Sequence, residues 1–247
     1  MENLHIEPFI VEFTLVTGRM IPNQVAHFDS LLAWCAVQEG YNLKLPNPIA
    51  EQENLPLAKV HGTNGEWCWR ASALHGVRNG GTQPVHYYRP YQLRDIAEAK
   101  DKYWTGKKID VLLMGTGSMK SFALIDAQAF TPSVVAVGYG DIQAIEKLLK
   151  KHITHIGRQH RNGYGEVKKI EVRKATEEQA QFWNRRTLPQ SLENYRSEDH
   201  REGVSPLHPP YWDTTKAVKA FELPANATVV DLLLKSIDAE VQCVPHS

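Results

Sequence analysis

The chain has 247 residues, and 42% of them are hydrophobic, which is enough to bury one sizeable core or one core with a small appendage. Lys and Arg together number 28, as do Asp and Glu, so the formal net charge is zero. This balance excludes a globally basic protein, and any contact with nucleic acid must rest on a localised basic patch.

The cysteines and apolar stretches indicate the cellular setting. Cys35, Cys68 and Cys243 are far apart and form no CxxC pair, so neither a zinc site nor a redox motif is expected. The N-terminus lacks a basic region followed by an apolar run, and no segment approaches the roughly 20 apolar residues of a membrane helix. We expect a cytoplasmic protein with reduced thiols, no metal, no cofactor and no membrane contact.

The first predicted elements are a strand and a helix. Residues 9–16 alternate with period two, which predicts a strand with one well-buried face that ends at Gly18. Asp29 or Ser30 can then cap a helix, and Gly40 stands where this helix would end.

Residues 41–108 are irregular, because five prolines and the Gly80-Gly81 pair divide them into short pieces. We interpret them as an insertion after the first helix, with a possible strand over residues 67–70. Residues 86–91 interleave aromatic and basic side chains, as surfaces for single-stranded nucleic acid do. Tyrosines buried in a long loop are an equally good interpretation.

Regular structure resumes after the insertion. Residues 109–114, 122–129 and 134–137 resemble strands, and Asp141 can cap a helix over residues 142–151. A last strand is indicated by Val167, Ile170 and Val172. This order predicts an α+β, ferredoxin-like (RRM-like) fold, in which two helices cover an antiparallel sheet. The core would span residues 1–175.

The tail, residues 176–247, differs in character. It contains Trp183, the proline- and aromatic-rich residues 206–212, and a short apolar stretch over residues 229–234. We expect this C-terminal extension to pack on the core, since its aromatic side chains would otherwise be exposed.

The glycine loop, residues 157–167, combines three glycines with two arginines, a histidine and a tyrosine directly after a predicted helix. Glycine lets the backbone approach a ligand, and the planar fork of arginine matches phosphate geometry. Lysines crowd the flanking segments, and a nucleic-acid backbone gains affinity from each phosphate neutralised. The alternative is a solvated basic helix followed by a tight turn.

Two nucleotide-binding motifs are incomplete. Residues 115–121 approach a phosphate-binding loop, but Met119 occupies the required glycine position, although Lys120 remains a candidate phosphate contact. Residues 138–143 approach a dinucleotide fingerprint, but Gln143 stands where a small residue is needed. We therefore reject the dinucleotide interpretation and keep a nucleotide-hydrolysing enzyme only as a third hypothesis, which predicts ATP turnover with Mg²⁺.

Two further motifs bear on catalysis and on RNA. His27 adjoins Asp29 and Ser30, but helix capping explains the latter two without acid and base chemistry. Residues 162–167 partly resemble the RNP1 motif of RNA-recognition modules, except that Glu166 replaces its second aromatic residue.

Taken together, the chain resembles the repeat-associated mysterious proteins (RAMPs) of CRISPR systems. The resemblance rests on residues 27–34, which are similar to the helix-opening signature of these proteins, on the turn over residues 115–122, and on residues 156–167. Within this superfamily the chain is most similar to the small subunit of type IV effector complexes that caps the 5′ handle of the guide RNA.

The resemblance implies a non-catalytic RNA-binding subunit of a ribonucleoprotein complex. Its partners would be the guide RNA, the adjacent backbone subunit, the large subunit and, through base pairing in the complex, target DNA. The insertion would form a thumb-like element that reaches a neighbouring subunit or splays the RNA. The expected RNA-binding residues are Lys120, Gly157, Arg158, Gln159, His160, Arg161, Gly163, Tyr164, Gly165 and Lys168.

A metal-independent endoribonuclease that processes precursor RNA is the alternative. Some related RAMP subunits cut RNA with combinations of tyrosine, lysine and histidine, and His155, His160, Tyr164 and Lys120 offer such groups. No spacing rule makes these side chains converge.

Overall fold

The structure is a computed structural model that describes residues 4–20, 25–77, 81–89 and 122–224. These residues form a mixed α/β protein with antiparallel sheets and few helices. The chain divides into two compact units, residues 82–128 and the remainder, and each is described by itself.

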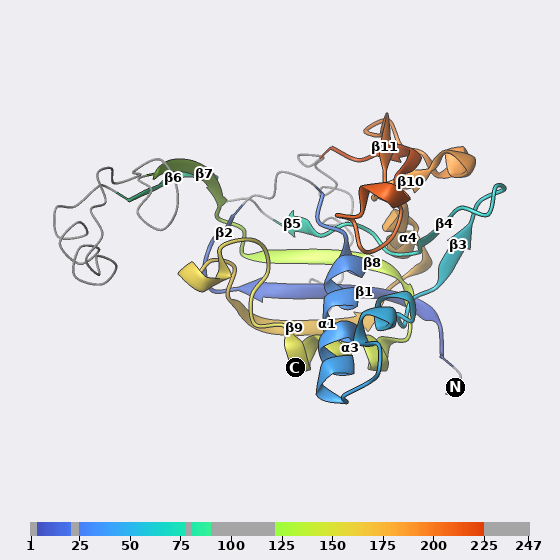
Figure 1. Ribbon diagram of the computed structural model, residues 1–247, viewed down its shortest axis with the longest axis horizontal. Coiled ribbons are helices and arrows are strands. Elements are labelled where there is room, and N and C mark those ends of the chain that lie inside the picture. The colour runs from blue at the N-terminus through green and yellow to red at the C-terminus, as the bar shows by residue number, and fades with distance from the viewer. Residues whose placement is uncertain (1–3, 21–24, 78–80, 90–121, 225–247) are drawn as a thin grey trace, which may run out of the picture. The chain divides into compact units, whose positions relative to one another are not determined.

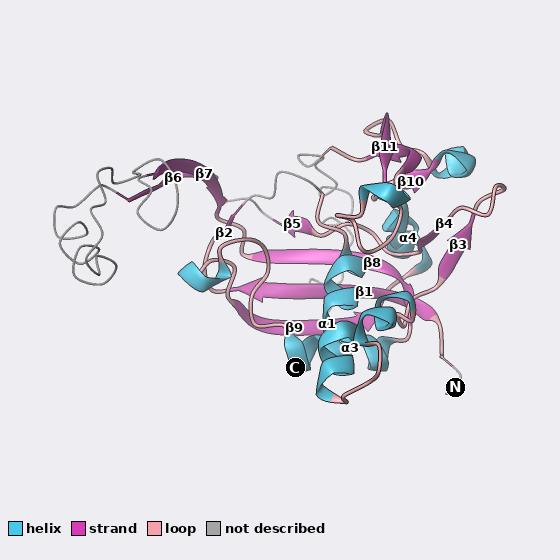
Figure 2. Cartoon of the chain, viewed as in Figure 1, coloured by secondary structure: helices cyan, strands magenta, loops and turns pink. Residues whose placement is uncertain are grey.

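A four-stranded sheet in the order β5-β8-β1-β9 organises the larger unit (Figures 1 and 2). Its central strands β1 and β8 are Glu7–Leu15 and Ser133–Gly140, and its edge strands β5 and β9 are His75–Val77 and Val167–Lys174. Every neighbouring pair is antiparallel, and Phe13 lies opposite both Val134 and Ile170. A short strand β2, Arg19–Met20, follows β1. The strands predicted over residues 9–16, over residues 134–137 and near Val167 are confirmed as β1, β8 and β9.

Two helices, α1 (Phe28–Asn42) and α3 (Ile142–His152), cover one face of the sheet, and α1 crosses in front of the strands in Figure 1. Alternate residues of β1 point toward them. Phe9, Val11 and Phe13 are buried in one core cluster with Leu32 of α1 and Leu149 of α3. Strand side chains alternate between the two faces of a sheet, so these three residues of β1 all point to the face that the helices cover.

The C-terminal extension covers the other face. Ile10 of β1 and Val137 of β8 share a second core cluster with Trp183, Leu188 and Phe221 from the extension. All eight residues of β8 are consequently buried. The extension contains a three-stranded sheet in the order β10-β12-β11. Its elements are α4 (Glu177–Ala180), η4 (Gln181–Asn184), β10 (Leu188–Pro189), η5 (Gln190–Tyr195), β11 (Arg201–Ser205), η6 (Thr214–Lys216) and β12 (Val218–Glu222).

A buried ion pair ties the extension to α1. Arg186 and Asp29 are both fully buried, and the Arg186 Nη2 atom lies 3.1 Å from Asp29 Oδ2. The Tyr211 hydroxyl also donates to this carboxylate, at 2.8 Å. Arg186 further donates to main-chain carbonyls, among them that of Trp69 at 2.7 Å. A buried charge is tolerated only with such partners, so this network fixes how the two segments meet.

The predicted start and end of the first helix were wrong. The helix starts at Phe28 with His27 as its N-cap residue, and no side chain caps it, because the Asp29 carboxylate binds Arg186 instead. It continues to Asn42 past Gly40, whose missing side chain leaves room for Pro48: a Cβ atom there would lie 3.0 Å from the Pro48 Cα atom.

Residues 41–77, which the sequence placed in an insertion, belong to the larger unit. They form η1 (Pro48–Glu53), β3 (Lys59–His61), β4 (Trp67–Trp69) and β5. The predicted strand over residues 67–70 is confirmed as β4. Because β5 pairs with β8, this segment supplies an edge strand of the main sheet.

The smaller unit contains β6 (Thr82–Arg89) and β7 (Phe122–Ala129), which are neighbours in one sheet. The Gln83 side chain donates to the Gln128 side chain across them, at 3.0 Å. The strand predicted over residues 122–129 is confirmed as β7, whereas the strand predicted over residues 109–114, the turn at residues 115–121 and the apolar stretch at residues 229–234 lie outside the described residues. Of the helices that the structure describes, none combines the length and hydropathy needed to cross a membrane.

Candidate nucleic-acid interface

Helix α3 leads into the glycine loop and positions its start. As predicted, Asp141 caps the helix, and its carboxylate accepts a hydrogen bond from the Ala144 amide at 2.9 Å. Ile145 and Leu149 bury the apolar face. The basic residues of the opposite face are partly neutralised: Lys150 pairs with Glu146 at 2.6 Å, and both Lys151 and His152 pair with Glu39.

The backbone of the glycine loop is repeatedly left-handed. Gly157, Gln159, Gly163 and Gly165 have φ values of 97°, 62°, 81° and 70°, with the short helix η3 (His160–Asn162) between the middle two. Three of these four positions are glycine, the residue that adopts positive φ without steric cost. The sequence therefore specifies this backbone path, and the strained Gln159 is held by the short turn that follows it.

Hydrogen bonds attach the loop to the chain that leaves β1. The Thr17 hydroxyl donates to the Gly163 carbonyl at 2.8 Å and accepts from the Glu166 amide at 3.0 Å. The Gly165 amide donates to the Gly18 carbonyl at 3.0 Å, and the Val16 amide donates to the Glu166 carbonyl at 2.8 Å. These bonds join both ends of the Gly163–Glu166 turn to residues 16–18, so the loop has a fixed base.

Gly165 is required by a close approach of two main-chain segments. A Cβ atom at this position would lie 1.9 Å from the Ile156 carbonyl oxygen, whereas nothing lies within 4 Å of one at Gly163. Ile156 in turn donates its amide to the Gly165 carbonyl at 2.8 Å. The absence of a side chain at Gly165 thus lets the end of the loop pack against its beginning.

The loop presents its polar side chains to solvent. Arg158, Gln159, His160 and Arg161 are exposed on it, and Lys168 is exposed just beyond it, where β9 bulges against β1. Within the described part of the chain, no carboxylate pairs with Arg161 or Lys168. This arrangement gives a cationic surface on a fixed backbone, which suits a polyanion.

The sequence-predicted site residues divide into three groups. Arg158, Gln159, His160 and Arg161 lie together on the exposed turn with Gly157, and Tyr164 is half-buried beside it. The amides of Gly163 and Gly165 donate to the His160 and Gly18 carbonyls, so these glycines shape the loop, and their contact with RNA stays a prediction. Lys120 lies outside the described residues.

Two features of the site were not apparent from the sequence. Thr17 fixes the loop from 146 residues away, and a threonine after a strand has no signature that indicates such a bond. His155 and His160 are brought together, with 6.3 Å between their ring centroids. In the described ranges, no three His, Cys, Asp or Glu side chains gather as metal ligands would.

Comparison with known proteins decides the family. Residues 7–223 match the model of a family described as "CRISPR type IV associated protein Csf3". The chain belongs to this Csf3 family. The predicted kinship with a type IV CRISPR protein is thereby confirmed.

Other comparisons add little to the Csf3 assignment. None of the curated proteins matches the chain. One similar solved chain comes from the "Cryo-EM structure of the Type III-B Cmr-beta bound to cognate target RNA", with 14% identity over 69% of this chain and a TM-score of 0.37. This Csf3-family chain spans 62% of the length of that chain. The TM-score is too low for the likeness to carry an argument.

Proposed function

We propose that this Csf3-family protein is a non-catalytic RNA-binding subunit of a type IV CRISPR ribonucleoprotein complex, and that its glycine loop contacts the phosphates of the guide RNA 5′ handle. The observation that carries the proposal is the exposed trio Arg158, His160 and Arg161 on a loop whose base is hydrogen-bonded to residues 16–18. A pre-formed loop loses little conformational entropy on binding, so its charges are more effective.

The fold supports the proposal. We propose that the main sheet is a ferredoxin-like core, since the strand order β5-β8-β1-β9, the antiparallel pairs and the helices after β1 and β8 match what such a fold requires. The glycine loop then lies between the second core helix and the last core strand. The proposed partners are the guide RNA, the backbone and large subunits of the complex, and target DNA through the complex.

The test removes two charges from the loop. Arg158→Ala combined with Arg161→Ala is expected to weaken binding of a repeat-derived RNA at least about tenfold, and to lower the slope of log affinity against log salt by about 1.4, because each phosphate contact on a single strand contributes about 0.7. Fluorescence anisotropy at several salt concentrations measures both quantities.

A matched control removes two exposed cations from the C-terminal extension. Arg201→Ala combined with Lys219→Ala, on β11 and β12, changes the net charge equally but leaves the loop intact. Its affinity for the RNA is expected to stay within about twofold of the unmodified protein. Equal losses in both double variants would show that overall charge, rather than the loop, binds RNA.

The 6.3 Å separation of the His155 and His160 rings makes the endoribonuclease the second candidate. Two histidines at this distance could act on the attacking and leaving oxygens of a phosphodiester. Incubation of the repeat RNA with the protein in EDTA separates the two functions. We expect intact RNA, and cleavage that disappears in His160→Ala would replace the non-catalytic assignment.

A further inference from the structure

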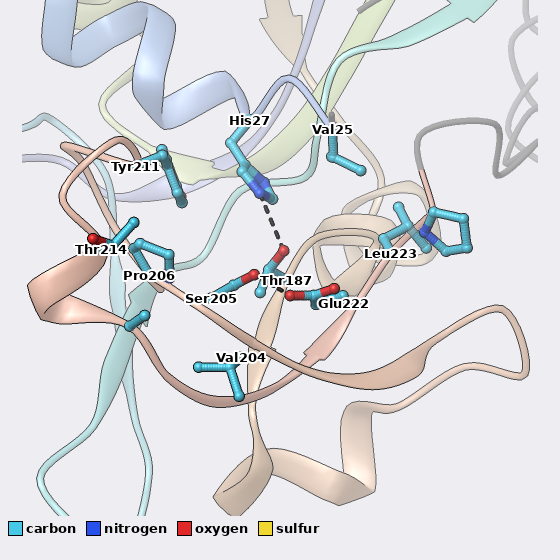
Figure 3. Close-up of a pocket in the computed structure, with 12 residues that line it drawn as sticks. Val25, His27, Thr187, Val204, Ser205, Pro206, Tyr211, Thr214, Glu222 and Leu223 are labelled. Carbon is cyan, nitrogen blue, oxygen red and sulfur yellow. Dashed lines mark hydrogen bonds between the residues drawn. The ribbon is translucent and has the colours of Figure 1, made fainter. Parts of the chain in front are cut away.

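A pocket of about 390 Å³ lies on the C-terminal extension, away from the residues of the glycine loop. It is bounded by the segment before α1, by β11 and the turn after it, and by the end of β12 (Figure 3). Sites for small ligands occupy this range of volume and combine apolar walls with a few polar groups. Val25, Pro206 and Leu223 supply such walls here.

The polar groups of the pocket form two hydrogen-bonded pairs. Figure 3 shows Thr187 between His27 on one side and Glu222 on the other, and the Thr187 hydroxyl lies 3.2 Å from His27 Nε2. Ser205 donates its hydroxyl hydrogen to Glu222 Oε1. Among the described residues no donor reaches the second carboxylate oxygen of Glu222. That oxygen is an acceptor without a partner at the pocket wall.

A second unpartnered group adjoins the same pocket. His27 is 5% exposed, and its Nδ1 atom is buried without a hydrogen-bond partner. The Tyr211 ring stacks on this imidazole with 4.5 Å between centroids. Burial and the nearby Arg186 charge hold the pKa of His27 well below its usual range, so the ring is neutral. Buried polar atoms in proteins usually have a hydrogen-bond partner, which can be protein, water or a ligand.

The charge of the lining selects the ligand. None of the twelve residues that line the pocket in the described part of the chain is Lys or Arg, and Glu222 is the carboxylate among them. A phosphate or carboxylate group would be repelled, whereas a flat ligand with N–H donors fits between apolar walls and an acceptor. The ligand therefore differs in kind from the phosphates expected at the glycine loop.

Guanine is the nucleobase that meets these requirements. Its N1–H and 2-amino groups point the same way and match the two oxygens of one carboxylate, whereas adenine, cytosine and uracil flank each donor with an acceptor. We propose that this pocket binds a guanine base, with Glu222 accepting from N1–H and the 2-amino group. The base belongs either to a free nucleoside or nucleotide or to an RNA, and the RNA case rests on the proposed function.

The test titrates the full chain with guanosine, inosine and adenosine and follows the ligands by NMR. Inosine differs from guanosine only in the missing 2-amino group, and adenosine lacks both donors. Guanosine is therefore expected to bind about tenfold more tightly than either. Glu222→Gln should remove this preference, because its amide donates where the ligand also donates. The control Glu202→Gln, on the neighbouring strand β11, should retain it.

A second variant keeps the proposal testable if Glu222→Gln does not fold. Val204 lines the pocket but is 65% exposed, so Val204→Trp fills the space with little effect on the core. It is expected to reduce guanosine binding at least about tenfold. Guanosine that binds no better than adenosine, or that binds equally well to Val204→Trp, would overturn the proposal.

Competition identifies the source of the base. The competitor is an RNA with one unpaired guanosine, and its control is the same RNA with inosine at that position. If the first RNA displaces bound guanosine better than the second, the site binds RNA. If neither RNA displaces guanosine, the site binds a free nucleoside or nucleotide. The Arg158→Ala, Arg161→Ala protein should still bind guanosine. Loss of RNA binding at the loop and loss of guanosine binding at the pocket are therefore separate results.

Discussion

Gly163 and Gly165 differ only in the space around them, which makes them a matched pair. Both have positive φ, but a Cβ atom at Gly165 would meet the Ile156 carbonyl at 1.9 Å. Gly163→Ala is expected to cost about 1 kcal/mol of unfolding free energy from backbone strain. Gly165→Ala is expected to cost about 1–3 kcal/mol more, because the clash requires the loop to move. Urea unfolding measures both, and equal costs would contradict the close approach.

Arg186 and Lys150 show how burial sets the value of an ion pair. Arg186→Met leaves the buried Asp29 carboxylate without its counter-charge and several main-chain carbonyls without their donor, at an expected cost of about 3–5 kcal/mol. Lys150 is 58% exposed, so Lys150→Met, which removes the pair with Glu146, should cost about 0.5 kcal/mol or less. Both values come from urea unfolding, and a cost for Arg186→Met as small as that for Lys150→Met would show that the buried network is dispensable.

At the scale of elements, the cap of α3 can be tested separately from its packing. Asp141→Ala removes the acceptor for the Ala144 amide and is expected to destabilise the protein by about 1 kcal/mol. Asp141→Asn retains an acceptor oxygen and should cost a few tenths of that. Thermal unfolding followed by circular dichroism distinguishes the two. Similar losses would mean that charge, rather than the hydrogen bond, is what stabilises this end.

The elements with local signals were predictable, and those that depend on distant partners were not. Strand β1 and helix α3 follow from period-two and helical spacing and from the cap at Asp141. The start of α1 was wrong because Asp29 pairs with Arg186, 157 residues later. Strand β5 has three residues, too few for a period, and it becomes a strand only by pairing with β8.

The candidate site was predictable to a similar extent. The composition of residues 157–167 indicated an anion-binding turn, and its arginines are indeed exposed. The composition could not predict the role of each glycine. Gly165 lacks a side chain because the Ile156 carbonyl lies against it, and its amide donates to the Gly18 carbonyl, and both contacts form only in the folded chain. The pocket at Glu222 was missed because its lining comes from several segments that are far apart in the sequence and share no motif.

For the whole molecule, two buried histidines predict loss of stability in mild acid. Burial lowers the pKa of His75 to about 4 and that of His27 well below its usual range. The unfolded chain takes up protons below about pH 6.5, while the folded chain leaves both rings neutral. The unfolding free energy should therefore fall from pH 6.5 to about 4, by up to about 1.4 kcal/mol per pH unit for each histidine.

Urea unfolding at pH 7.5, 6.5, 5.5 and 4.5 measures this slope. His75→Gln should make it shallower, whereas His61→Gln, at an exposed position, should leave it unchanged. Stability that stays level or rises between pH 6.5 and 4.5 would contradict the assignment of neutral buried rings.

The burial of β8 on both faces has a consequence for synthesis. The core on its helical face contains buried residues up to Ile156, whereas the core on its other face also requires Trp183, Leu188 and Phe221. Until the ribosome has added these residues, Val135 and Val137 lack part of their cover, and exposed apolar strand surface is prone to aggregation. We therefore expect a fragment that stops before residue 183 to require a chaperone or a partner to remain in solution.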